Sequence, residues 1–203
     1  MRIGVDFDNT IANYHGVFHR AAVEKHLVPY DLPASKNNVR DYLNGAGRNI
    51  EFTELQGYVY GSRMDLASPY AGFLNFIDYA LADGHEINII SHKTKEPLLG
   101  TKYDLHAAAL KFLNDWEIIR ADRLMADKIF FEPTKEAKVA KISSEKIDIF
   151  IDDLLDILNA DGFPHFTRGI LFDPDQKFKP QILTQSRFSS WPDISRELLG
   201  ISP

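Results

Sequence analysis

Short apolar runs that each end at a polar residue recur along the chain. They are rich in isoleucine, valine and phenylalanine, which β-strands favour. Five runs predict buried strands, and they cover residues 2–5, 86–90, 128–131, 147–151 and 169–172. The sequence shows no fixed-period repeat and no low-complexity tract, so the pattern indicates one sheet assembled from separate segments.

Helical patterns separate these runs. Apolar residues recur at helix spacing over 73–80 and 105–113, and residues 135–142 form a shorter pattern that Thr134 can cap. Strands that alternate with amphipathic helices are typical of a parallel sheet covered on both faces. The sequence therefore predicts an α/β fold with a Rossmann-like parallel sheet.

Residues 14–69 break this alternation. They contain helical stretches around 17–25 and 53–60 and a polar segment, 35–49, rich in glycine and asparagine. This composition predicts a small helical insertion after the first strand. The expected domains are then a core of residues 1–13 and 70–203 and an insertion of residues 14–69.

The last part of the chain is polar. Pro180 and Pro192 interrupt it, and a short helix is predicted over 193–199. We expect this tail to pack on the core through Trp191.

Composition narrows the functional classes. The chain has 203 residues, of which 44% are hydrophobic, enough for one α/β domain with an insertion. With 23 Lys and Arg against 29 Asp and Glu, the net charge of −6 gives no broad surface for a nucleic-acid polymer or an anionic membrane.

Cysteine is absent, which excludes disulfides, thiol nucleophiles and cysteine-based zinc sites. No apolar leader follows Arg2 and no run approaches the length of a membrane span, so we expect a cytoplasmic protein.

Polar residues stand where the predicted strands end. Asp6 follows the first strand, Ser91 the second, residues 132–134 the third, and the pair Asp152-Asp153 the fourth. In parallel α/β sheets, ligands bind beyond the carboxyl ends of the strands. The sequence therefore predicts one site that gathers these side chains.

The segment Asp6-Phe7-Asp8-Asn9-Thr10 carries the strongest chemical signal. Two carboxylates one residue apart can point into the same cleft, where one attacks a phosphoryl group and the other delivers a proton to the leaving oxygen. An isolated D-x-D is more often a solvated turn; its position after a buried strand favours the chemical interpretation.

This segment resembles the first motif of the haloacid dehalogenase (HAD) superfamily, whose pattern is D-x-D-x-[T/V]. The resemblance implies that Asp6 is the nucleophile and an Mg²⁺ ligand, and that Asp8 is the general acid/base and ligates the metal through its carbonyl. It also implies that Thr10 orients Asp8. An aspartate at the second position is typical of the phosphatases of the superfamily.

Ser91 resembles the second motif, in which a hydroxyl binds the phosphoryl group, and Lys93 is a candidate for a second phosphate contact. The third motif is a lysine near the start of a helix, which offsets the negative charge of the nucleophile and the phosphate. Lys138 is preferred for this role, and Lys135 stays open as the alternative.

Asp152 and Asp153 resemble the fourth motif, an acidic pair that serves the metal. Asp153 is preferred as the direct Mg²⁺ ligand, and Asp152 would hold a metal-bound water or the catalytic lysine. Which of the two binds the metal directly stays open.

The insertion resembles the C1 cap of the superfamily, and the overall plan resembles its 5′-nucleotidase-like members. Within it, two glycines frame Tyr58 and Tyr60, and Arg63 follows. Arg63 could meet a phosphate or carboxylate of the substrate. The alternative, which the sequence favours slightly, is a helix end whose tyrosines pack on the core.

These features predict a metal-binding, Mg²⁺-dependent phosphatase that hydrolyses a small phosphomonoester, a nucleotide or a sugar phosphate, through an aspartyl-phosphate. A phosphotransferase or mutase of the same superfamily, a receiver-like signalling module and a non-catalytic phosphate-binding protein are the alternatives. The expected partner is a small phosphorylated substrate, without a nucleic-acid polymer or a membrane. The sequence does not indicate the oligomeric state.

Overall fold

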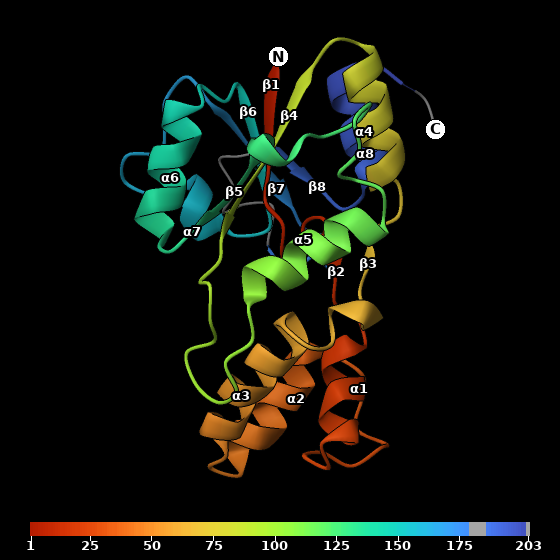
Figure 1. Cartoon of the computed structure of the whole chain (residues 1–203), viewed down its shortest axis with the longest axis vertical. Helices are drawn as coiled ribbons and strands as arrows, with labels where there is room; N and C mark the ends of the chain where they lie inside the picture. The colour runs from red at the N-terminus through yellow and green to blue at the C-terminus, as the bar shows by residue number, and fades with distance from the viewer. Residues whose placement is uncertain (179–185, 202–203) are drawn as a thin grey trace. The chain divides into compact units, whose positions relative to one another are not determined.

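The structure, a computed structural model, describes residues 1–178 and 186–201. Pro180 therefore lies outside the described residues. The chain divides into two compact units (Figure 1). The sheet unit contains residues Met1–Ala12, Pro69–His92 and Glu117–Pro203, and the helical unit contains Asn13–Ser68 and Lys93–Trp116. The helical unit thus includes the predicted insertion of residues 14–69 except Pro69, and a second segment, 93–116, that the sequence analysis assigned to the core.

A six-stranded parallel sheet forms the centre of the sheet unit, in the strand order β5-β4-β1-β6-β7-β8. The strands are β1 (Arg2–Val5), β4 (Glu86–His92), β5 (Ile129–Glu132), β6 (Ile149–Asp152), β7 (Arg168–Phe172) and β8 (Ser186–Phe188). The α/β fold with a parallel sheet and a small helical insertion is confirmed. The sequence analysis expected the first five of these strands but not β8.

Strand β1 lies at the middle of the sheet, and Val5 pairs with Ile89 of β4 on one side and Ile151 of β6 on the other. The chain leaves β1 toward β4 and β5, and later crosses β1 to build β6, β7 and β8. This reversal makes the carboxyl ends of β1 and β6 a topological switch point, where parallel sheets form their binding crevices.

Different helices cover the two faces of the sheet. On one face, Phe150 and Leu171 belong to a buried cluster with residues of α6 (Lys135–Ser144) and α7 (Leu155–Leu158). Phe172 points to the opposite face because successive strand residues alternate. There its ring lies 5.5 Å from that of Trp191 in α8 (Trp191–Leu199), which packs beside α4 (Phe73–Ala82) (Figure 1).

Trp191 is fully buried, as expected for the anchor of the tail. Its ring lies 4.9 Å from that of Phe73 and 4.8 Å from that of Phe76. Its indole Nε1 donates a hydrogen bond of 3.1 Å to the carbonyl of Thr10. The C-terminal helix therefore holds the loop that follows β1.

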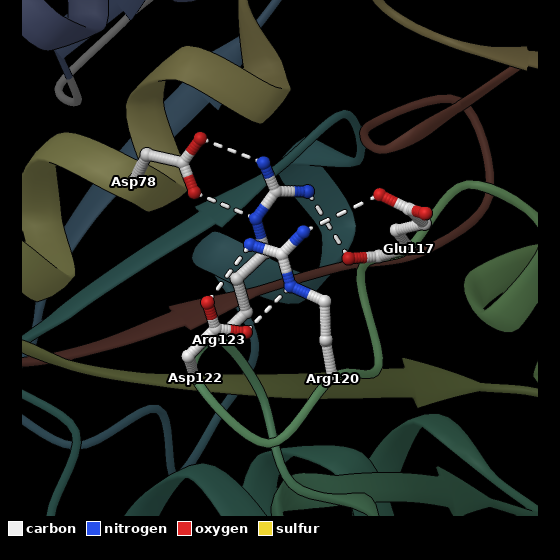
Figure 2. A network of polar contacts seen from close by, with 5 residues as sticks. All are labelled: Asp78, Glu117, Arg120, Asp122 and Arg123. Atoms are coloured by element: carbon white, nitrogen blue, oxygen red, sulfur yellow. Dashed lines mark hydrogen bonds and ion pairs between the residues drawn. The ribbon is translucent and has the colours of Figure 1, made fainter.

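An ion-pair network fastens residues 117–124 to α4 (Figure 2). The guanidinium of Arg123 binds both carboxylate oxygens of Asp78, at 2.6 and 2.7 Å, and also donates to the carbonyl of Glu117. Arg120 pairs with the side chains of Asp122 and Glu117 within the same loop. This loop is where the chain re-enters the sheet unit, and the short 3-10 helix η2 (Ala126–Lys128) follows it before β5.

The helical unit consists of α1 (Val17–Glu24), α2 (Lys36–Gly45), α3 (Asn49–Tyr60), the 3-10 helix η1 (Met64–Leu66) and α5 (Leu105–Asp115). The two-residue strands β2 (Ala12–Asn13) and β3 (Ser68–Pro69) pair where the chain enters and leaves its first segment. The sequence analysis did not expect helix α2. Ser35 caps it by accepting a hydrogen bond from the backbone N–H of Asn38, and it buries Val39 and Leu43, four residues apart.

None of the helices formed by residues 1–178 and 186–201 combines the length and the apolar character that crossing a membrane requires.

Candidate active site

The loop after β1 is tightly held. Its first residue, Asp6, continues the sheet ladder by donating its backbone N–H to the carbonyl of Ile151 at 2.9 Å. The carbonyl of Phe7 then accepts the backbone N–H groups of both Ile11 and Ala12. Asn9, with a φ of 60°, makes the turn, a conformation that asparagine tolerates better than most residues. The loop therefore presents Asp6 and Asp8 from a backbone with little freedom.

Lys138 joins the carboxyl ends of β1 and β6. Its Nζ lies 2.6 Å from Oδ1 of Asp6 and 2.6 Å from Oδ2 of Asp152. The lysine is 1% exposed, and both carboxylates are buried. A buried ammonium is stable only when it is paired, and here two carboxylates pair it. Lys135, one turn earlier on α6, instead pairs with Asp156 at the surface.

Two hydroxyl groups also face Asp6. Ser91 Oγ at the end of β4 donates to Oδ1 at 3.0 Å, so this hydroxyl and Lys138 converge on one carboxylate oxygen. Thr10 Oγ1 lies 3.5 Å from Oδ2, at the outer limit for a hydrogen bond. The sequence analysis expected Thr10 to orient Asp8. The structure places this hydroxyl near Asp6, and a role of Thr10 in orienting Asp8 stays a prediction.

The carboxylates of Asp6, Asp152 and Asp153 offer oxygens that all lie within 4.8 Å of one another. Lys138 supplies one positive charge, so two negative charges remain uncompensated when all three carboxylates are ionised. Hard carboxylate oxygens are the ligands that Mg²⁺ prefers, and its charge would balance this excess. Asp152 has one oxygen on Lys138 and the other on the backbone N–H of Leu154, at 2.9 Å. Asp153 therefore fits a divalent cation better than Asp152, and Asp6 can offer its Oδ2, whose contact with Thr10 is long.

The pKa values reflect this crowding. Burial raises the pKa of the Asp6 carboxyl to about 6, and the negative charge of Asp152 adds to the shift although Lys138 opposes it. Burial, together with the charge of Asp6, also holds the pKa of Asp153 well above its usual range. Burial alone would lower the pKa of the Lys138 ammonium, but the charges of Asp152 and Asp6 outweigh burial and raise it. The site thus keeps its lysine charged, and the pKa values of two of its carboxyls lie above their ordinary value.

Asp8 is half-buried in the same loop, and its backbone pairs with that of Ala12 in an isolated β-bridge. The structure thus brings Asp6, Asp8, Ser91, Lys138, Asp152 and Asp153 to one end of the sheet, all within the sheet unit.

The other two predicted site residues, Lys93 and Arg63, belong to the helical unit. The ammonium of Lys93 lies 5.1 Å from the centre of the Tyr60 ring. The guanidinium of Arg63 pairs with Glu24 and with Asp65. A substrate contact for Arg63 stays a prediction that requires these ion pairs to open.

The sequence analysis gave no role to Tyr70, which lies against the site. Its backbone N–H donates to the carbonyl of Ile11, and its ring meets that of Phe172 at 4.9 Å. Burial raises the pKa of its phenol, and the charges of Asp175 and Asp153 raise it further. Its position at the end of the predicted insertion was the only sequence signal that could have marked it.

The sheet order, the helical insertion after β1 and the acidic groups at the ends of β1 and β6 define a class of fold. It is the fold of the HAD-superfamily hydrolases, and many solved structures with this fold match the chain over nearly its whole length. A HAD-superfamily hydrolase from Ehrlichia chaffeensis matches with a TM-score of 0.55 and 15% identity, covering 98% of this chain and 96% of that one. A HAD family hydrolase from Deinococcus radiodurans R1, solved with bound phosphate and sodium, matches with a TM-score of 0.57 and 12% identity, covering 98% and 95%.

The protein YfnB from Bacillus subtilis, solved bound to magnesium, matches with a TM-score of 0.50 and 14% identity, covering 97% of each chain. Identities this low show the fold alone. Searches of protein-family models and of curated proteins found no match to the sequence.

Proposed function

We propose that this protein is an Mg²⁺-dependent phosphatase in which Asp6 attacks the phosphoryl group of a small phosphomonoester. The observation that carries the proposal is the convergence of Lys138 Nζ and Ser91 Oγ on Oδ1 of Asp6, at 2.6 and 3.0 Å. A buried lysine and a hydroxyl beside a nucleophilic carboxylate are the donors that phosphoryl oxygens need. Structures with the same fold that hold phosphate or magnesium support this assignment.

The reaction divides into two steps. In the first, the carboxylate of Asp6 forms a bond to phosphorus while the bond to the leaving oxygen breaks, and Asp8 gives its proton to that oxygen. In the second, Asp8 takes a proton from water, and the oxygen of that water attacks phosphorus. The bond between phosphorus and the Asp6 oxygen breaks, which regenerates the carboxylate of Asp6 and releases inorganic phosphate. Thr10 and Lys93 would contact the substrate phosphate.

The metal would be held by the carboxylates of Asp6 and Asp153 and, by resemblance to the superfamily, the carbonyl of Asp8. Bound Mg²⁺ supplies positive charge that keeps these carboxylates ionised and neutralises phosphoryl oxygens. Asp152 would act by holding Lys138 in place, because both of its oxygens are already engaged by hydrogen bonds. Lys138 would stabilise the charge that develops on the phosphoryl group.

Hydrolysis of p-nitrophenyl phosphate tests the proposal. We expect turnover with Mg²⁺, none with EDTA, and none from the Asp6→Asn protein with Mg²⁺. An Asp6→Asn protein that kept the metal-dependent rate would contradict the mechanism. Turnover that appears only when an acceptor alcohol is added would instead identify a phosphotransferase or mutase of the same fold.

A further inference from the structure

Tyr70 directly follows β3 and belongs to the sheet unit. Its backbone N–H donates a hydrogen bond of 2.9 Å to the carbonyl of Ile11, in the loop after β1. The preceding carbonyl of this loop, that of Thr10, accepts the indole N–H of Trp191 at 3.1 Å. Two aromatic residues from distant parts of the chain therefore hold successive carbonyls of the loop that carries the first motif.

The ring of Phe172 joins these two aromatic residues. Its centre lies 5.5 Å from that of the Trp191 ring and 4.9 Å from that of the Tyr70 ring, which it meets edge to face. Trp191 and Phe172 are buried, and Tyr70 is half-buried at the more exposed end of this row. Because packing fixes the ring of Tyr70, its hydroxyl loses little conformational entropy when it makes a hydrogen bond.

The register of the sheet places Asp153 beside Phe172. In the pairing of β6 with β7, Asp152 lies opposite Leu171, so the residues that follow them, Asp153 and Phe172, are neighbours. Neighbouring residues of parallel strands point to the same face of the sheet. Tyr70 contacts Phe172 on this face, so its ring lies on the same side of the sheet as Asp153.

The electrostatics of the phenol agree with this placement. Burial raises the pKa of the Tyr70 phenol, and the negative charges of Asp175 and Asp153 raise it further. The phenol is therefore uncharged at neutral pH, and its hydroxyl can both donate and accept a hydrogen bond. Within residues 1–178 and 186–201, this hydroxyl has no hydrogen-bond partner. A half-buried hydroxyl of this kind beside an acidic site is suited to a bound water or ligand.

Asp153 differs from the other two carboxylates of the site. Asp6 and Asp152 each accept hydrogen bonds from protein donors, whereas Asp153 accepts none from the described residues. Mg²⁺ is usually bound by one or two carboxylates, and waters and phosphate oxygens fill the rest of its octahedral shell. Water on a divalent cation is polarised and donates strong hydrogen bonds. The oxygen of a nearby phenol is a suitable acceptor for them.

We propose that Tyr70 is a positioning residue of the metal site, whose hydroxyl accepts a hydrogen bond from a water molecule bound to the cation that Asp153 holds. This inference rests on the proposed function, which places Mg²⁺ at Asp6 and Asp153. Hydrogen bonds from outside the ligand set orient the ligands and strengthen metal binding. Tyr70 and both carboxylates belong to the sheet unit, so the contact requires nothing of the helical unit.

Calorimetric titration with Mg²⁺ alone tests the proposal. Tyr70→Phe removes the hydroxyl but keeps the ring that packs on Phe172. We expect its dissociation constant for Mg²⁺ to be about tenfold larger than that of the wild type. Its melting temperature in EDTA should stay close to that of the wild type. In the hydrolysis of p-nitrophenyl phosphate, the variant should need more Mg²⁺ for half of its maximal rate, with a kcat at saturating Mg²⁺ close to that of the wild type.

Tyr79→Phe is the matched control, since Tyr79 lies on α4 in the same unit and is 46% exposed. It should bind Mg²⁺ as the wild type does. A Tyr70→Phe protein that binds Mg²⁺ as tightly as the wild type would overturn the proposal, as would equal weakening in both variants. Unchanged Mg²⁺ affinity together with a higher KM would assign the hydroxyl to the substrate instead.

Failure of the proposed function would look different. The wild type would then hydrolyse no p-nitrophenyl phosphate in the presence of Mg²⁺. Mg²⁺ binding that is lost in Asp153→Asn and weakened in Tyr70→Phe would still support the role of Tyr70 at a metal site. A wild type that neither turns over nor binds Mg²⁺ would overturn both proposals.

Discussion

The ammonium of Lys138 bridges Asp6 and Asp152, 2.6 Å from an oxygen of each, and it is the only lysine of α6 that reaches them among the described contacts. Lys138→Met removes the charge but keeps much of the side-chain volume. We expect it to lower kcat by about 100-fold or more, in the range seen when a group that stabilises the transition state is removed. Steady-state kinetics with p-nitrophenyl phosphate checks this.

Lys135→Met is the matched control, because Lys135 is on the same helix but pairs with Asp156 at the surface. It should keep a rate close to that of the wild type. Melting curves of both variants show whether a loss of rate comes from unfolding. Equal losses in two folded variants would show that Lys138 has no special role.

The raised pKa of Asp6 predicts that metal-free protein loses stability as the pH rises. The carboxyl has a pKa of about 6 in the folded chain, above its ordinary value of 3.8. Between these values the folded state keeps a proton that the unfolded state releases, so stability falls as the pH rises through 6. The asparagine of the Asp6→Asn protein has no carboxyl group, so its stability lacks this pH dependence. The melting temperature of Asp6→Asn minus that of the wild type, both in EDTA, should therefore rise between pH 4 and pH 7, by roughly 3 °C or more. A difference independent of pH would contradict the shift.

The proposed metal ligand Asp153 can be tested by the effect of Mg²⁺ on thermal stability, without a measurement of activity. The proposed Mg²⁺ site exists only in the folded protein, so Mg²⁺ should raise the melting temperature of the wild type. At 100 times the dissociation constant, a ligand that binds only the folded state stabilises it by about 2.7 kcal/mol. Asp153→Asn should remove most of this rise. Asp156→Asn, three residues further on and paired with Lys135 at the surface, should keep it. A full Mg²⁺ effect in Asp153→Asn would show that the metal binds elsewhere.

At Gly4, in the central strand β1, the packing leaves no room for a larger side chain. A Cβ at this position would lie 2.6 Å from Cδ2 of Phe150, its partner across the β1–β6 ladder. Gly4→Ala should destabilise the protein by about 1–3 kcal/mol, the usual range for overpacking a core. Urea denaturation checks this. Gly45→Ala, at the end of α2 where nothing lies within 4 Å, should be neutral or slightly stabilising because alanine favours helices.

The ion-pair network of Figure 2 predicts unequal effects of two neighbouring arginines. Arg123 is 13% exposed and binds Asp78 through two bonds, so Arg123→Ala should cost about 1–3 kcal/mol of unfolding free energy. Arg120 is 43% exposed and its partners lie in its own loop, so Arg120→Ala should cost at most about 1 kcal/mol. Urea denaturation of both variants gives the comparison. Equal costs would mean that the bond to Asp78 does not hold the loop.

The strands and the polar residues at their ends were predictable because each apolar run is short and stops at a charged or hydroxyl side chain. Helix α2 could not be predicted in this way, because its sequence is mostly polar and only Val39 and Leu43 mark its buried side. Strand β8 was missed for a similar reason, since its three residues, Ser186–Phe188, are only partly buried.

The sequence analysis preferred Lys138 to Lys135, but the sequence alone could not decide between them. The two lysines are three residues apart on one helix, and only the placement of α6 beside β4 and β5 decides which one meets Asp6. The direction of the Thr10 hydroxyl depends instead on local backbone geometry, the tight loop between Phe7 and Ala12, which the motif pattern alone does not specify.

The hydrogen bond from the indole of Trp191 to the carbonyl of Thr10 joins two residues 181 positions apart. During synthesis on the ribosome, Thr10 leaves the exit tunnel long before Trp191 has been added. At about 5–20 residues per second, synthesis of the 181 residues from Thr10 to Trp191 takes roughly 9–36 s. Throughout it, the loop that carries Asp6 and Asp8 lacks its C-terminal support. We expect the nascent chain to reach its active geometry only after Trp191 has emerged from the ribosome, so that fragments that end before Trp191 contain the first motif without this support.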